Sequence, residues 1–135
     1  MKILVIDAQG GGLGKQLVAA LKKSLPEDEI IAAGTTSIAS SAMLKAGAKY
    51  AATGENAIIV NARKADVIVG PVGIVIADSL YGEITPKMAA AIGQSDAVRI
   101  LIPFNRCENV IIGIQDLSVS HLIENAVEEA VKLHK

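Results

Sequence analysis

The sequence predicts a doubly wound α/β fold, in which helices cover both faces of a mostly parallel sheet. Short apolar runs alternate with segments of helical spacing along the 135 residues, and continuous apolar runs are typical of strands covered on both faces. Aromatic residues make up only 2% of the chain, so the core is expected to consist of Val, Ile, Leu and Ala. This length fits one domain of the usual size of about 100–200 residues.

The first half of the chain supplies three expected strands with their helices. Residues 3–6 form the first strand, and the helix that follows a Gly-rich turn ends at Pro26. Residues 29–33 form the second strand, after which the hydroxyls of residues 35–37 offer a helix N-cap. Residues 49–52 give a short third strand.

The middle of the chain holds a conflict between local propensity and topology. The β-branched triplet within residues 57–64 favours a strand locally. Residues 66–69 are the next strand, however, and two parallel strands need a crossover of about a dozen residues between them. We therefore expect residues 57–64 to be a helix. Residues 74–77 fit either a helical turn or a short edge strand.

The C-terminal third predicts one antiparallel strand. A helix begins at Thr85-Pro86, with proline at its first position, and residues 98–104 form the fifth strand. A connection of five residues then leads to the apolar run 110–114. This is too short for a crossover, so the two strands are expected to form an antiparallel hairpin. Asp116 or Ser118 caps the last helix.

We expect a ligand at the Gly-rich turn between the first strand and the first helix. N–H groups converge there and the helix dipole adds about half a positive charge, so such a turn binds phosphate. In doubly wound sheets, ligands lie outside the carboxyl ends of the strands where the strand order reverses. If the first and fourth strands are neighbours, a second Gly-rich turn faces the first. The expected cofactor-binding residues are Gln9, Gly10, Gly11, Gly12, Leu13, Gly14, Lys15, Thr35, Thr36, Gly70, Pro71, Val72 and Gly73.

The turn matches no nucleotide motif completely. In the dinucleotide pattern G-x-G-x-x-G, Gln9 replaces the first glycine, and in the short-chain reductase spacing Ala8 does so. No acidic residue follows the second strand to bind the adenosine ribose of NAD, although the hydroxyls of residues 35–37 can bond a 2′-phosphate. Gln9 and Gln16 replace the residues that a P-loop needs, while Lys15 can still reach a phosphate. The alternative is a turn that only packs helix against strand.

Polar residues after the expected strand ends are candidates for the crevice. Asp7 either holds a metal or a ligand hydroxyl, or accepts N–H bonds from the turn; the second role is favoured, because Asx residues commonly do so. Arg106 can pair with a phosphate or carboxylate, and Cys107 is either a nucleophile or a small packing residue. No metal site is expected, because His121 and His134 have no Cys neighbours. The candidate crevice residues are Asp7, Gly54, Glu55, Asn56, Asp78, Asn105, Arg106 and Cys107.

Composition argues against several classes of partner. The net charge is -1 and aromatics are scarce, so neither the cation clusters of duplex binders nor the stacking platforms of single-strand binders are present. The apolar stretch 67–77 is shorter than the roughly 18 residues of a membrane span, and the N-terminal apolar run is too short for a signal peptide. One cysteine allows no internal disulfide. We expect a cytoplasmic protein.

Five segments resemble one known family. They are residues 5–16, 42–48, 52–57, 65–79 and 102–107. They are similar to a bacterial family labelled only domain of unknown function 3842, and the similarity spans nearly the whole chain. The resemblance implies a single small Rossmann-like domain. It implies no activity, so no catalytic residue follows from it.

Three functional hypotheses follow from these observations. The leading one is a Rossmann-like protein that binds a nucleotide or dinucleotide, such as NAD(P), in a sensor or accessory role. A chain this short has little room for a second, substrate-binding domain. The second is a small NAD(P)-dependent reductase or another nucleotide-dependent enzyme that uses Cys107, Asp78 or Glu55. The third is a homo-oligomeric interaction protein with no ligand, whose interface contains residues 74–77.

Overall fold

The computed structural model describes residues 1–104 and 108–134, and these form a five-stranded parallel sheet. Its strands are β1 (Lys2–Asp7), β2 (Glu29–Gly34), β3 (Tyr50–Thr53), β4 (Val67–Pro71) and β5 (Val98–Ile102). The spatial order is β3-β2-β1-β4-β5. Because β1 pairs with β2 on one side and β4 on the other, the strand order reverses between β1 and β4. The doubly wound α/β prediction is confirmed.

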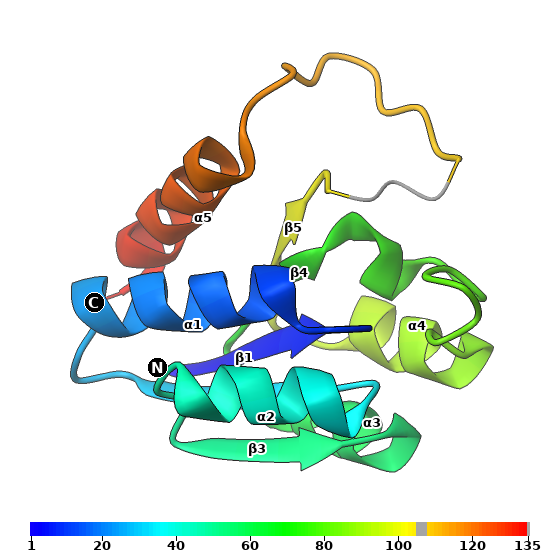
Figure 1. Ribbon diagram of the computed structural model, residues 1–135, viewed down its shortest axis with the longest axis horizontal. Helices are drawn as coiled ribbons and strands as arrows, with labels where there is room; N and C mark the ends of the chain where they lie inside the picture. The colour runs from blue at the N-terminus through cyan, green and yellow to red at the C-terminus, as the bar shows by residue number, and fades with distance from the viewer. Residues whose placement is uncertain (105–107, 135) are drawn as a thin grey trace.

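Helices cover both faces of this sheet (Figure 1). One layer consists of α1 (Gly12–Ser24), α2 (Ser37–Lys45) and α5 (Val119–Leu133). The other consists of α3 (Glu55–Lys64), the 3-10 helix η1 (Val72–Val75) and α4 (Pro86–Gln94). No helix among the described residues has both the length and the apolar character needed to cross a bilayer.

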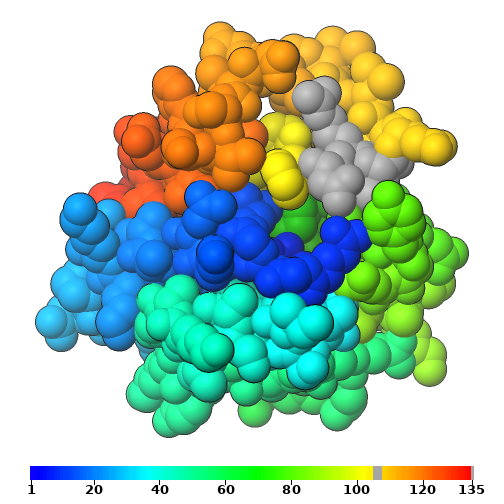
Figure 2. Space-filling model, in the orientation of Figure 1, coloured from blue at the N-terminus to red at the C-terminus, as the bar shows by residue number. Residues whose placement is uncertain are grey.

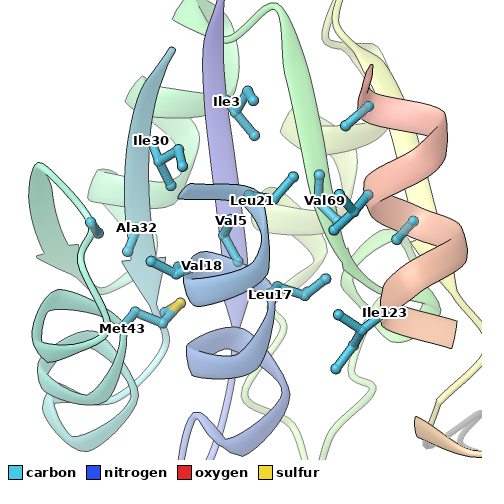
Figure 3. Close-up of a cluster of buried hydrophobic side chains, with 14 of the residues drawn as sticks. Ile3, Val5, Leu17, Val18, Leu21, Ile30, Ala32, Met43, Val69 and Ile123 are labelled. Atoms are coloured by element: carbon cyan, nitrogen blue, oxygen red, sulfur yellow. The ribbon is translucent and has the colours of Figure 1, made fainter. Parts of the chain in front are cut away.

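Each face of the sheet has its own apolar core. Successive residues of a strand point to opposite faces, so Val5 packs in one core and Leu4 in the other. Figure 3 shows the first core, where Val18 from α1 and Met43 from α2 pack beside Val5. Strand β1 is therefore buried on both sides, as its continuous apolar run predicts.

The topological argument for residues 57–64 is confirmed, since α3 spans Glu55–Lys64. Ile58 and Ala62, one helical turn apart, are both fully buried against the sheet. Of residues 74–77, the first two lie in the helical turn η1, and residues 76 and 77 form a bend and a turn rather than an edge strand. Ile74 is fully buried, so that side chain is not on the surface where the third hypothesis needs it.

Three predicted helix starts are also confirmed. Thr36, Thr85 and Ser118 cap α2, α4 and α5, each accepting a hydrogen bond from the N–H three residues further on. The donor–acceptor distances lie between 3.1 and 3.2 Å. Pro86 occupies the first turn of α4 as expected.

The antiparallel strand expected at residues 110–114 is wrong. All strands among the described residues run parallel, and residues 108–118 form turns and irregular backbone that arch away from the sheet (Figure 1). The side chains of Val110 and Ile112 are 84% and 90% exposed. An apolar, β-branched sequence favours a strand only where a pleated, half-buried surface receives it. Neither helical layer nor the sheet supplies such a surface here.

Candidate ligand-binding site

A cleft of about 350 Å³ lies at the carboxyl ends of β1 and β4. Figure 2 shows it as a hollow between the blue N-terminal turn and later segments in green and yellow. The strand order reverses here, which is where doubly wound sheets hold their ligands. The cleft is lined by Asp7, Ala8, Gln9, Gly10, Gly11, Gly12, Leu13, Gln16, Pro71, Leu80, Phe104 and Val119.

Two of the four glycines in the first turn are required by the fold itself. Gly11 has φ +74°, and a Cβ there would lie 2.7 Å from the Cα of Ala39. A Cβ at Gly14 would lie 2.6 Å from the Sδ of Met43. A larger residue at Gly11 would press on the backbone of α2, and one at Gly14 would displace the side chain of Met43 and press on that of Asp7.

The other two glycines, Gly10 and Gly12, have no such requirement. A Cβ on either would meet no atom within 4 Å, and neither has a positive φ. Both are exposed and both line the cleft. Their missing side chains leave the backbone of the turn open to a molecule in the cleft.

The N-terminus of α1 carries two N–H groups that remain available. The N–H of Gly14 donates to Asp7, and that of Lys15 donates to the carbonyl of Gly11 at 2.9 Å. Within the described part of the chain, the N–H groups of Gly12 and Leu13 have no acceptor. An anion can accept from both, at the positive end of the helix dipole.

The Asp7 carboxylate fastens this turn to the end of β1. It is only 6% exposed, and it accepts the N–H of Ala8 at 2.8 Å and that of Gly14 at 2.6 Å. Burial raises the pKa of the Asp7 carboxyl; the hydrogen bonds from Gly14 and Ala8 oppose that rise, and the nearby charge of Glu83 adds to it. These bonds are the structural role that the sequence favours for Asp7.

Glu83 does not line the cleft, but its carboxylate holds Gln9, which does, and the sequence analysis did not find it. Its Oε1 accepts the N–H of Gln9 at 2.8 Å and the hydroxyl of Thr35 at 2.5 Å. Glu83 comes from the loop between η1 and α4, 74 residues from Gln9. Left-handed backbone at Leu80 and Tyr81, with φ of 56° and 58°, shapes that loop. No local sequence signal links positions so far apart.

The two predicted threonines are bonded within the protein. Thr35 donates to Glu83, and the hydroxyl of Thr36 donates to the carbonyl of Gln9 at 2.6 Å while it caps α2. Gln9 has φ 54°. Its left-handed backbone is thus held by Thr36 at the carbonyl and by Glu83 at the N–H.

The second Gly-rich turn reaches the cleft through Pro71. A Cβ at Gly70 would lie 2.5 Å from the carbonyl oxygen of Ile6, and one at Gly73 would lie 3.1 Å from the Oγ of Ser79. The Ser79 hydroxyl donates to the carbonyl of Gly73. The glycines of this turn therefore serve close packing, and Val72 between them is half-buried.

A family model matches residues 2–135 of the chain. The chain belongs to the family described as Domain of unknown function (DUF3842). Comparison with curated proteins found no match. Among solved structures, the dodecameric FMN-dependent UbiX-like decarboxylase from Escherichia coli O157:H7 is similar, with 14% identity and a TM-score of 0.44. That match covers 98% of this chain and 93% of that chain, and a likeness of this degree carries no functional argument.

Several predicted residues of this DUF3842 chain lie away from the cleft. Lys15 lines a groove between α1 and α2, together with Ser37 and Lys45. Glu55, flanked by Gly54 and Asn56, begins α3, and its carboxylate accepts the hydroxyl of Thr85 at 2.5 Å. The cleft lining includes none of them.

The candidates of the enzyme hypothesis are not brought together among the described residues. Asp78 is exposed and lines a separate hollow with Tyr81 and Glu108. Glu55 is held by Thr85 at the start of α3. The predicted residues Asn105, Arg106 and Cys107 lie outside the described residues.

Proposed function

We propose that this DUF3842 protein binds a nucleotide or dinucleotide, holding a phosphate at the N-terminus of α1, in a sensor or accessory role. One observation carries the proposal: the turn leaves the N–H groups of Gly12 and Leu13 without an acceptor in the described residues, beside glycines that packing does not require. Phosphate oxygens are strong acceptors, and a helix N-terminus favours their charge.

The glycine at position 12 supports a ligand rather than a purely structural turn. Replacing Gly by Ala where the backbone conformation allows it stabilises a protein by about 0.4–1 kcal/mol. Gly12 is the first residue of α1, and the space around it would accept an Ala side chain. Because the fold gives no reason for Gly12, we attribute it to the close approach of a bound group.

The rest of the cleft suits the organic part of a nucleotide. Pro71, Leu80, Phe104 and Val119 supply apolar lining opposite the polar turn. Ligand sites commonly combine apolar walls with a few polar groups, in volumes of about 300–1,000 Å³. A cleft of about 350 Å³ lies within that range and suits a mononucleotide or half of a dinucleotide.

The test is calorimetric titration of the protein with ATP, ADP, NAD(H), NADP(H) and FMN. We expect at least one of them to bind, and a Gly12→Val change to weaken its affinity about tenfold or more by filling the cleft, a loss of about 1.4 kcal/mol. Gly93→Val is the matched control, since Gly93 is exposed in α4 and a Cβ there also meets nothing within 4 Å.

Two outcomes would contradict the proposal. One is the absence of binding for every nucleotide at millimolar concentration. The other is equal binding by wild type, Gly12→Val and Gly93→Val, which would place the ligand elsewhere on the protein. Thermal unfolding of both variants shows whether each remains folded.

A further inference from the structure

We infer that Glu83 binds the ribose hydroxyls of the nucleotide and excludes a 2′-phosphate. This inference rests on the proposed function, and it assigns the ligand class: a ribonucleotide with an unmodified 2′-hydroxyl.

The carboxylate of Glu83 is fixed in place but retains free acceptor capacity. Its Oε1 accepts from the N–H of Gln9 and the hydroxyl of Thr35. Its Oε2 accepts no hydrogen bond from any described residue. An ionised carboxylate offers about four acceptor positions, so two remain for hydroxyl donors, and the residue is only partly buried.

The position of Glu83 matches the chemistry that a nucleotide needs. Gln9 follows β1 and Thr35 follows β2, so the carboxylate lies at the carboxyl ends of both strands. In dinucleotide-binding folds, an acid near the end of the second strand accepts a hydrogen bond from the ribose 2′-hydroxyl. β2 ends at Gly34 without such an acid. Glu83 supplies one from a distant loop.

The contacts divide the turn into two subsites, one that favours hydroxyl donors and one that favours an anion. Glu83 already occupies the N–H of Gln9, and its negative charge repels a phosphate at that position. The available N–H groups belong to Gly12 and Leu13, further along the turn. A ligand with an anionic group at one end and hydroxyl donors at the other satisfies both subsites, as ribonucleoside phosphates do.

The same geometry reverses the expectation that threonines bind a 2′-phosphate. The hydroxyl of Thr35 donates to Glu83 and that of Thr36 to the carbonyl of Gln9. A 2′-phosphate at this position would face the Glu83 carboxylate. The inference therefore predicts that the protein prefers NAD to NADP.

Three matched probes test this in the wild-type protein: AMP, 2′-deoxy-AMP and adenosine 2′,5′-bisphosphate, with inorganic pyrophosphate as the phosphate-only reference. We expect AMP to bind about tenfold more tightly than 2′-deoxy-AMP, since a hydrogen bond to a charged group is lost. The bisphosphate should bind more weakly still. Equal affinities for AMP and 2′-deoxy-AMP would overturn the inference while leaving the proposed phosphate site intact.

Pyrophosphate separates the two proposals. Pyrophosphate binding without AMP binding overturns only the Glu83 inference. If neither these probes nor the nucleotides tested above bind, the proposed function itself fails.

Variants of Glu83 distinguish ligand binding from support of the turn. In Glu83→Gln, the ratio of AMP to 2′-deoxy-AMP affinity should approach one, and binding of the bisphosphate should improve about tenfold because the charge repulsion is removed. Pyrophosphate affinity should change much less than either, because the N–H groups of Gly12 and Leu13 remain in place. Glu128→Gln, at an exposed position of α5, removes the same charge and should behave as wild type. If Glu83→Gln loses pyrophosphate and AMP binding equally, Glu83 only positions the turn. If the variant does not fold, the relative affinities of the wild-type protein for AMP, 2′-deoxy-AMP and the bisphosphate provide the test.

Discussion

The two Gly-rich turns that meet at the cleft look alike in sequence but differ in what their glycines do. In the second turn, both Gly70 and Gly73 sit where a Cβ would press on Ile6 or Ser79. In the first turn, Gly10 and Gly12 face open space. Glycine content alone therefore does not mark a ligand site. The informative glycines are those at positions where the fold has room for a larger side chain.

The two turns are also anchored by different chemistry. Asp7 holds the first turn through a carboxyl group that accepts the N–H groups of Ala8 and Gly14. Ser79 holds the second through its neutral hydroxyl, which donates to the carbonyl of Gly73. The first anchor titrates with pH and the second does not, so the turns should respond differently to acid.

The largest expected effect is at the second turn. Gly70→Ala places a Cβ 2.5 Å from the backbone carbonyl of Ile6, and because β1 and β4 are paired central strands, neither can move easily. Overpacking of this kind costs about 3 kcal/mol of unfolding free energy, measurable by urea denaturation. A loss below about 1 kcal/mol would mean that the glycines of this turn, like Gly12, are not dictated by packing.

A second, smaller effect is the pH dependence of stability, which should differ between the Asp7 anchor and the Ser79 anchor. The pKa of Asp7 is raised above its ordinary value of 3.8, so the folded state holds this proton more tightly than the unfolded state does. Its stabilising contribution is complete below the unfolded pKa and is lost as pH rises through the raised folded pKa. We therefore expect the difference in unfolding free energy between wild type and Asp7→Asn to decrease as pH rises through that window.

Ser79→Ala is the matched control for this pH experiment. It removes the hydroxyl that anchors the second turn, so it should lower stability by about 1 kcal/mol at every pH. A difference from wild type that changes with pH in the same way for both variants would show that the effect does not come from Asp7.

Much of this fold could be predicted because its constraints act over short stretches of chain. Residues 57–64 form a helix because the strands on either side need a crossover, which outweighs the β-branched triplet. The run 110–114 fails as a strand because its propensity is local whereas the covering surface is not, and Ile112 is 90% exposed. The strand propensity of a segment does not depend on whether the rest of the chain packs against it.

The candidate site also has features that local sequence predicts and features that it does not. The first turn can be found from the sequence because strand, glycines and helix follow one another. The role of Glu83 cannot, because its contact with Gln9 spans 74 residues and depends on how the loop before α4 bends. Nor can sequence separate Gly12 from Gly14, since the distinction depends on the distance to Met43 in another helix.

The smallest expected change in stability is at Gly12, and it is the sharpest test of the comparison between the turns. Gly12→Ala adds a methyl group where nothing lies within 4 Å, at the first residue of α1. Ala is the better helix former, so unfolding free energy should rise by up to about 1 kcal/mol. Nucleotide affinity should fall in the same variant, because the methyl group lies at the mouth of the phosphate subsite. Denaturation and calorimetry on one preparation measure both quantities. A variant that is more stable and binds as well as wild type would remove the ligand-based reason for this glycine, and the two turns would then differ only in packing.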